Sequence, residues 1–333
     1  MSEALVSSTQ KTPRLLQPKD TYTIDYPKAV EFAEQQMGIY WLPTEIKVEK
    51  DVQDLMVNMT DAERHGVITT LKLFTLYELR VGGDYWLGRV RNTFKRPEIE
   101  FMASTFGFVE LGIHARFYNQ INEAMMLNTD EFYSSYLDDP ILSDRIKFVE
   151  DAAGDEDLPF ALGVFSLIEG AVLYSNFAFL KHFQSQGKNK LVNVNAGINF
   201  SVRDESLHSA AGAWLYRTLI SEYGLDNGDL ELVQMKIIEA AKAIYEHEER
   251  IVDMVFERGD IDGIDSEDMK RFVKHRINLC LDNLGIDPIY DDTDSHIESW
   301  FYLGTGGTAT LGDFFYAVNS EYNRNWNETE FTW

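Results

Sequence analysis

The sequence is poor in cysteine, in proline and in positive charge. The single cysteine, Cys280, can form neither an intramolecular disulfide nor a thiolate metal site, which is typical of a reducing compartment. Only eight prolines interrupt 333 residues, so long helices are favoured. Thirty Lys and Arg residues against 55 Asp and Glu residues give a formal charge of −25, which would repel a phosphate backbone. We therefore expect no nucleic-acid partner, and the lack of an apolar signal core in residues 1–14 predicts a cytoplasmic protein.

One apolar run is nearly long enough to cross a membrane. It covers residues 158–180, and Glu169 lies in its middle with 11 uncharged residues on each side. A carboxylate at the centre of a bilayer costs about 3 kcal/mol or more. We therefore predict a buried core helix that carries one carboxylate, and no membrane span.

The spacing of apolar residues predicts an all-α protein with one helical domain at residues 21–300. A flexible N-terminal arm is expected at residues 1–20 and a flexible C-terminal tail at 301–333. Thr60 and Glu63 form a capping-box sequence at the start of a long helix. The helical stretches are expected at 27–36, 60–91, 97–127, 129–152, 157–186, 190–222, 229–258 and 266–284.

Metal-binding residue types recur on four of these expected helices. They form two Glu/His pairs, each on one helix face, and two single acids. The residues are Glu110 with His114, Glu205 with His208, and the single acids Asp84 and Glu169. Ferritin-like di-metal proteins place single acids on two helices and Glu/His pairs on the other two. The pattern therefore predicts a ferritin-like helical bundle with a di-metal carboxylate site.

The charge balance explains why these residue types would occur together. Four buried carboxylates are very costly without cations, whereas two divalent metals balance four negative charges. Carboxylate and imidazole ligands suit iron and manganese alike, so we expect two iron ions, or an Mn/Fe or Mn/Mn pair. Each piece has an ordinary alternative: His114 as a core histidine, Asp84 as a surface acid, and Glu205 with His208 on a solvated helix face. Their combination favours the metal site.

At these positions the sequence resembles the small, radical-generating subunit of class I ribonucleotide reductase. Arg203–His208 is similar to the family's Arg-Asp-Glu-x-x-His signature, and His114–Tyr118 is similar to its His-Ala-Arg-x-Tyr segment. The resemblance implies a homodimer in which the metals and dioxygen oxidise Tyr118 to a stable radical. Tyr118 follows His114 by one helical turn, so both face the same side.

The resemblance also implies a route that carries the radical away from Tyr118. Trp41 resembles the tryptophan of that route, and Asp204 the acid that links it to a metal-bound histidine. Tyr322 resembles the tail tyrosine that passes the radical to a separate large (alpha) subunit, which reduces ribonucleoside diphosphates or triphosphates. Residues 325–333 resemble the segment that docks there. The ordinary alternatives are packing for Trp41 and, for Tyr322, a place among 16 tyrosines of no special role.

One position departs from the family pattern. The pattern expects an acid at position 111, but Leu111 stands there and Glu110 precedes it. Three explanations remain open: Glu110 reaches the metal from its rotated position, a π-bulge near Gly112 restores the placement, or one ligand is lost. Gly82 and Gly83, just before Asp84, are a second oddity and are expected to loosen their helix.

The sequence is therefore expected to encode the small subunit of a class I ribonucleotide reductase. A ligand-binding di-metal oxidase on the same fold is the alternative, and Trp41, Tyr118 and the tail argue against it. An iron-storage or structural helical protein is a more remote one, since neither needs an aromatic relay.

Overall fold

The computed structural model describes residues 12–303, and within this range the protein is helical except for loops and one β-bridge between Ile261 and Ile264. The α-helices are α1 (Pro27–Gly38), α2 (Asp61–Arg80), α3 (Arg91–Thr93), α4 (Pro97–Val109), α5 (Ala115–Ala124), α6 (Asp130–Asp138), α7 (Pro140–Gly154), α8 (Leu158–Ala171), α9 (Tyr174–Lys181), α10 (Val192–Tyr223), α11 (Asn227–Val255), α12 (Ser266–Leu284) and α13 (Glu298–Phe301). Shorter π- and 3₁₀-helical segments are η1 (Arg14–Leu16), η2 (Pro43–Glu45), η3 (Val48–Asp51), η4 (Asp54–Asn58), η5 (Val81–Val90), η6 (Glu110–His114) and η7 (His182–Gln184). The all-α prediction is confirmed.

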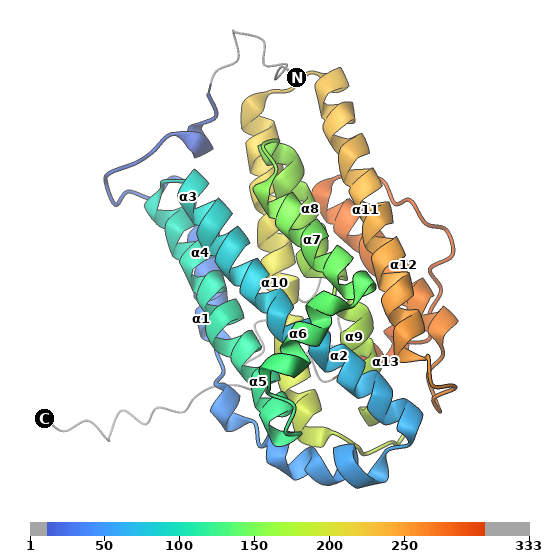
Figure 1. The fold of residues 1–333 in the computed structure, drawn as a ribbon. Coiled ribbons are helices and arrows are strands. Elements are labelled where there is room, and N and C mark those ends of the chain that lie inside the picture. Colours follow the sequence, from blue (N-terminus) through green and yellow to red (C-terminus); the bar gives the residue numbers. More distant parts are fainter. Residues whose placement is uncertain (1–11, 304–333) are drawn as a thin grey trace, which may run out of the picture.

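The long helices run side by side, with α1 and α4 on one flank of the bundle and α11 and α12 on the other (Figure 1). The centre is formed by α8 against α10 and by α2 against α5, while η5 packs on α4. Buried Glu and His residues from α2, η6, α8 and α10 meet here, so the fold brings four distant parts of the sequence together.

Two local sequence features set helix ends, and the first is the capping box predicted from the sequence. The Thr60 hydroxyl accepts a hydrogen bond from the Glu63 amide (3.2 Å), and the Glu63 carboxylate accepts one from the Thr60 amide (2.8 Å), which completes the capping box that starts α2. Gly224, with φ of +59°, ends α10 in the left-handed conformation that glycine adopts without strain.

The apolar run that could cross a membrane by length and composition is a core element. It spans Leu158–Gln184, and 83% of its most apolar window is buried inside the protein. The run is not one helix, because the chain breaks at Val172 and Leu173, where Leu173 adopts a φ of +72°. The prediction of a buried core segment is confirmed, and that of a continuous helix over 157–186 is wrong.

The expected N-terminal arm begins to pack earlier than predicted. Leu15 is fully buried and its amide donates to the Glu222 carboxylate at 2.7 Å. Arg96 donates to the carbonyls of Arg14 and Gln17. Residues 12–17 therefore belong to the helical domain, and the expected boundary at residue 20 is too late. At the other end Phe301 is buried, and residues 304–333, including most of the expected tail, lie outside the described residues.

Two π-helical segments lie where single α-helices were expected. Residues 60–91 form α2 followed by η5, and residues 97–127 form α4, η6 and α5 in succession. Each such continuous helical run is called a helical column below. Gly82 lies where the column α2–η5 touches the column α4–η6–α5, because a Cβ atom placed there would be 2.7 Å from Glu110 Cβ and 2.9 Å from Leu111 Cγ. Gly82 permits this close approach, and the helix around Gly82 and Gly83 is π-helical over Val81–Val90 where a regular α-helix would be tighter.

We expect Gly82→Ala to lower the free energy of unfolding by about 1–3 kcal/mol, because the added methyl overpacks the contact with Glu110 and Leu111. Gly83→Ala is the matched control, since a Cβ there meets no atom within 4 Å. It should be neutral, or stabilising by up to about 1 kcal/mol. Urea unfolding of the two variants checks this, and equal midpoints would show that Gly82 is not a packing constraint.

Candidate metal centre

Six buried side chains from four helical columns meet at the centre of the bundle. They form two overlapping groups, each offering four ligand atoms within 4.8 Å of one another. The first position is defined by Glu78, Glu110, His114 and Glu205, and the second position by Glu110, Glu169, Glu205 and His208. Glu110 and Glu205 belong to both, as expected of carboxylates that bridge two ions.

Both histidines turn the same ring nitrogen toward the carboxylates. His114 Nδ1 lies 2.9 Å from Glu110 and 3.2 Å from Glu205, and His208 Nδ1 lies 2.5 Å from Glu110. The opposite nitrogens are held from outside the cluster: His114 Nε2 lies 3.2 Å from Asp204 Oδ2, and His208 Nε2 lies 3.1 Å from Gln36 Oε1. With the proton on Nε2, each Nδ1 lone pair is free to bind a metal.

Aromatic side chains enclose the cluster and shield it from bulk solvent. The Trp86 indole donates to Glu169 Oε1 at 2.5 Å, and the ring of Phe106 lies 4.3 Å from that of His208. Trp86, Phe106 and His208 are completely buried, and Glu169 is 2% exposed. Charges held in such surroundings interact strongly, because little water screens them.

Burial and mutual repulsion perturb the acids and bases of the cluster. Burial, together with the nearby Glu110, raises the pKa of Glu78 well above its usual value, and burial with Glu205 does the same for the pKa of Glu169. Burial alone would lower the pKa of His208, but Glu110 raises it to about 9. Without cations these groups therefore hold protons, which metal ions would displace on binding.

The donor set fits two divalent metals. Both oxygens of Glu78 and Oε2 of Glu169 are buried and have no hydrogen-bond partner among residues 12–303. Unpaired buried carboxylate oxygens are costly unless a cation meets them. Four glutamates and two imidazoles also match the inventory of ferritin-like di-metal sites.

One residue that was expected to bind metal lies outside the cluster. Asp84 is 48% exposed at its side chain and lies 3.6 Å from Arg80 on the outer face, so its assignment to the cluster was wrong. Glu78, which sequence reasoning missed, takes the position instead. A signal for it exists, because Glu78 lies on the buried stripe of its helical column. The other members of this stripe are Val67, Leu71, Phe74, Val81 and Tyr85, all of them buried.

The departure at Glu110 and Leu111 is resolved by backbone geometry. Residues Glu110–His114 form a π-helical turn, which accommodates one extra residue between the glutamate and the histidine. Glu110 is completely buried and contacts both histidines, as the π-bulge explanation predicted. Leu111 is only partly buried and packs against Gly82 at the column contact, so it does not enter the deep core.

Three of the residues expected to carry the radical are among the described residues, and they lie beside the first position. The Tyr118 ring is completely buried, 6.3 Å from His114 and stacked on Phe74 at 4.5 Å. Asp204 Oδ2 accepts a hydrogen bond from Trp41 Nε1 at 2.8 Å as well as facing His114. An unbroken chain of contacts therefore joins His114, Asp204 and Trp41. Tyr322 lies outside the described residues.

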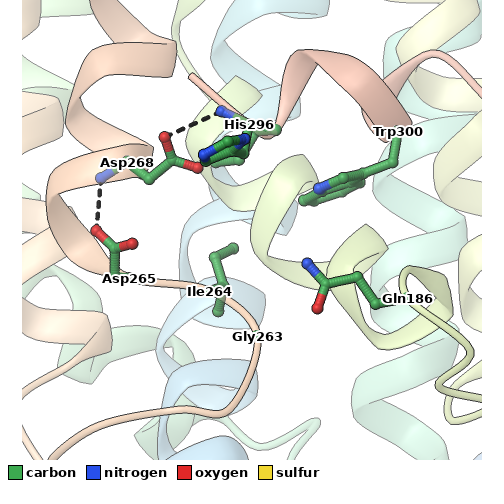
Figure 2. Close-up of a pocket in the computed structure, with 8 residues that line it drawn as sticks. Gln186, Gly263, Ile264, Asp265, Asp268, His296 and Trp300 are labelled. Carbon is green, nitrogen blue, oxygen red and sulfur yellow. Dashed lines mark hydrogen bonds between the residues drawn. The ribbon is translucent and has the colours of Figure 1, made fainter. Parts of the chain in front are cut away.

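A surface pocket of about 320 Å³ shares no residue with the cluster. It lies at the start of α12 beside Trp300 and Gln186 (Figure 2). Its Asp268 accepts hydrogen bonds from the His296 amide and from Arg271, and its Asp265 caps α12. Both acids are therefore engaged in local hydrogen bonds that hold this part of the chain together.

Known proteins resemble this chain along most of its length. The family described as "Ribonucleotide reductase, small chain" matches residues 19–297. The ribonucleoside-diphosphate reductase subunit beta of Treponema pallidum is 24% identical over 91% of this chain and 87% of its own. A probable small subunit from Invertebrate iridescent virus 3 is 23% identical, over 83% of this chain and 77% of its own.

Solved structures share the fold. The dimanganese(II) NrdF protein of Streptococcus sanguinis superposes with a TM-score of 0.74 at 21% identity, covering 87% of this chain and 99% of that one. The R2 subunit of Clostridium botulinum ribonucleotide reductase gives a TM-score of 0.70 at 21% identity, covering 85% and 89%. The ferritin-like bundle predicted from the sequence is confirmed.

The family match covers well over half of the chain, and the buried carboxylate and histidine cluster is what a di-metal site in that fold requires. The chain therefore belongs to the ribonucleotide reductase small-chain family of oxidoreductases and acts as a small subunit of that enzyme.

Proposed function

We propose that this subunit holds two first-row metal ions, iron or manganese, and uses them with dioxygen to generate a radical on Tyr118 for a separate large subunit. The observation that carries the proposal is the buried cluster with Tyr118 beside its first position. Metals bound there would supply the one-electron oxidation of a phenol, which no side chain of the cluster can perform alone.

The protein's own groups prepare Tyr118 for that oxidation. Burial, reinforced by Glu78, raises the pKa of Tyr118 well above its usual value, so the phenol stays protonated until it is oxidised. The charges of Glu78 and His114 both act on this phenol, and the Tyr118 ring lies 6.3 Å from that of His114. Phe74 and the buried surroundings exclude water, which would quench a radical.

Trp41 and Asp204 supply the exit from this site in our proposal. Asp204 is completely buried and touches both the imidazole of His114 and the indole of Trp41, so an electron and a proton can move along one line of contacts. Tyr322 then continues the route to the large subunit.

Three further features of the assembly are proposed with this function. They are a homodimer of this chain, reduction of ribonucleoside diphosphates or triphosphates by the large subunit, and a cytoplasmic location. The relatives named as ribonucleoside-diphosphate reductase subunits favour diphosphates. The alternative of a ligand-binding di-metal oxidase is disfavoured, because it gives no role to the contact between Trp41 and Asp204.

Glu78→Ala should weaken Mn²⁺ binding at the first position by at least about a hundredfold, since even outer partners of a metal ligand contribute 10- to 100-fold. Asp84→Asn is the matched control six residues along the same column, and its exposed carboxylate should change affinity by about twofold or less. Anaerobic calorimetry with Mn²⁺ measures both. A normal two-ion stoichiometry for Glu78→Ala would remove Glu78 from the ligand set.

Tyr118→Phe removes one hydroxyl from a buried ring, so metal content and fold should persist, with a stability change of about 1 kcal/mol. We expect the tyrosyl signal in electron paramagnetic resonance and the turnover with the large subunit to disappear together. Retained turnover would place the oxidising equivalent on another group.

Trp41→Phe and Tyr322→Phe should each leave the Tyr118 radical detectable but lower turnover with the large subunit by at least about a hundredfold, or about 2.7 kcal/mol. The control is Trp214→Phe, which replaces a half-buried indole packed on Tyr26 and Phe32 away from the cluster. Wild-type turnover in Trp41→Phe would show that its contact with Asp204 serves packing only.

A further inference from the structure

The helix that carries Glu169 ends abruptly two residues later. The chain leaves helical geometry at Val172, and Leu173 turns into the left-handed region with φ of +72°. The last carbonyls of a helix have no partner within it, so an end buried at the centre of a protein needs donors from elsewhere. Glu169 lies in this last turn, and whatever holds the turn also sets where its carboxylate points.

Arg276 of α12 supplies those donors. Its Nε and Nη2 both donate to the Gly170 carbonyl, at 3.0 and 2.7 Å, and its guanidinium lies 3.8 Å above the ring of Tyr174, on the far side of the break. Arg276 is only 1% exposed. Its positive charge at a helix C-terminus is also electrostatically favourable.

The approach of α12 and α10 to this turn is close enough to exclude any side chain at position 170. A Cβ on Gly170 would lie 2.3 Å from Cys280 Sγ and 2.4 Å from Ser209 Oγ. One turn earlier, Ser166 and Ser209 exchange hydrogen bonds between each hydroxyl and the other's carbonyl, at 2.9 and 2.8 Å. The turn is therefore fixed from α10 on one side and from Arg276 on the other.

The remaining guanidinium nitrogen reaches the C-terminal end of the described chain. Arg276 Nη1 donates to the Tyr302 hydroxyl at 2.9 Å, and Tyr302 follows the buried Phe301 that packs on Tyr174. The contacts form a series from Tyr302 through Arg276 to the Gly170 carbonyl, directly beside Glu169.

We propose that Arg276 is a positioning residue for the second metal position: it fixes the last turn of α8 so that Glu169 meets the ion shared with His208, and Tyr302 holds the guanidinium in place. The inference rests on the proposed function in that the cluster must bind metal. It differs from a general stabilising role, because that would affect both metal positions equally.

The test is Arg276→Lys, which keeps the charge but loses the planar two-nitrogen contact with Gly170. Mn²⁺ is added anaerobically to the full chain, and the occupancy of each position is followed by calorimetry and by anomalous scattering from crystals at limiting Mn²⁺. We expect affinity at the second position to fall by about 10- to 100-fold while the first position is unchanged.

The matched control is Arg96→Lys, because Arg96 is also a buried arginine that donates to backbone carbonyls, those of Arg14 and Gln17, but contacts no residue of the cluster. Both metal positions should keep their affinity in this variant. Tyr302→Phe, which loses a single hydroxyl, should show a smaller loss confined to the second position.

Equal weakening of both positions in Arg276→Lys, or no weakening at all, overturns the inference. If Arg276→Lys does not fold, Tyr302→Phe decides, and wild-type affinity at both positions in that variant overturns it as well. Failure of the wild-type chain to bind two Mn²⁺ ions at the cluster would instead refute the proposed function.

Discussion

Mutual repulsion between four buried carboxylates is the constraint on which the rest of this structure depends. Glu78, Glu110, Glu169 and Glu205 converge in the buried centre of the bundle, and one oxygen of each lies within 4.8 Å of an oxygen of another. Desolvation makes such an arrangement unfavourable unless protons or cations compensate for it. The raised pKa values of Glu78 and Glu169 are the protein's response in the absence of metal. A core built this way gains stability on metal binding, since ions that bind only the folded chain favour folding.

Bringing the four acids together requires departures from regular helix geometry. The π-helical turn Glu110–His114 inserts one residue so that a glutamate and a histidine four apart face one cluster, and the π-helical η5 begins three residues after Glu78. The break after Ala171 ends the helix of Glu169 within one turn of its carboxylate. Gly82 lets the first two columns approach without a side chain between them. Each of these irregularities lies within a few residues of a cluster member. The helices therefore depart from regular geometry next to the residues that form the cluster.

The sequence was sufficient for the fold and for five members of the cluster. Amphipathic periodicity and capping signals reflect local energetics, and Glu169 was recognisable because burying a lone acid among 22 uncharged neighbours needs a reason. Asp84 was mistaken for a ligand because it is an acid on the same helical column as Glu78. The choice between the two acids depends on which face of that column is buried. Periodicity favours Glu78, whose stripe is apolar throughout. The supporting roles of Gln36 and Arg276 depend on contacts between distant segments, which no local pattern encodes.

The two histidines both turn Nδ1 toward the carboxylates, but their Nε2 atoms contact different residues. The two metal positions therefore differ in what lies behind their histidine. The Nε2 atom of the His208 imidazole contacts Gln36, a neutral amide. The imidazole of His114 contacts Asp204, an ionisable acid that also binds the indole of Trp41. Tyr118 lies on the same side, one turn from His114. The first position therefore faces the proposed radical route, while at the second position Trp86 and Phe106 enclose Glu169 and His208.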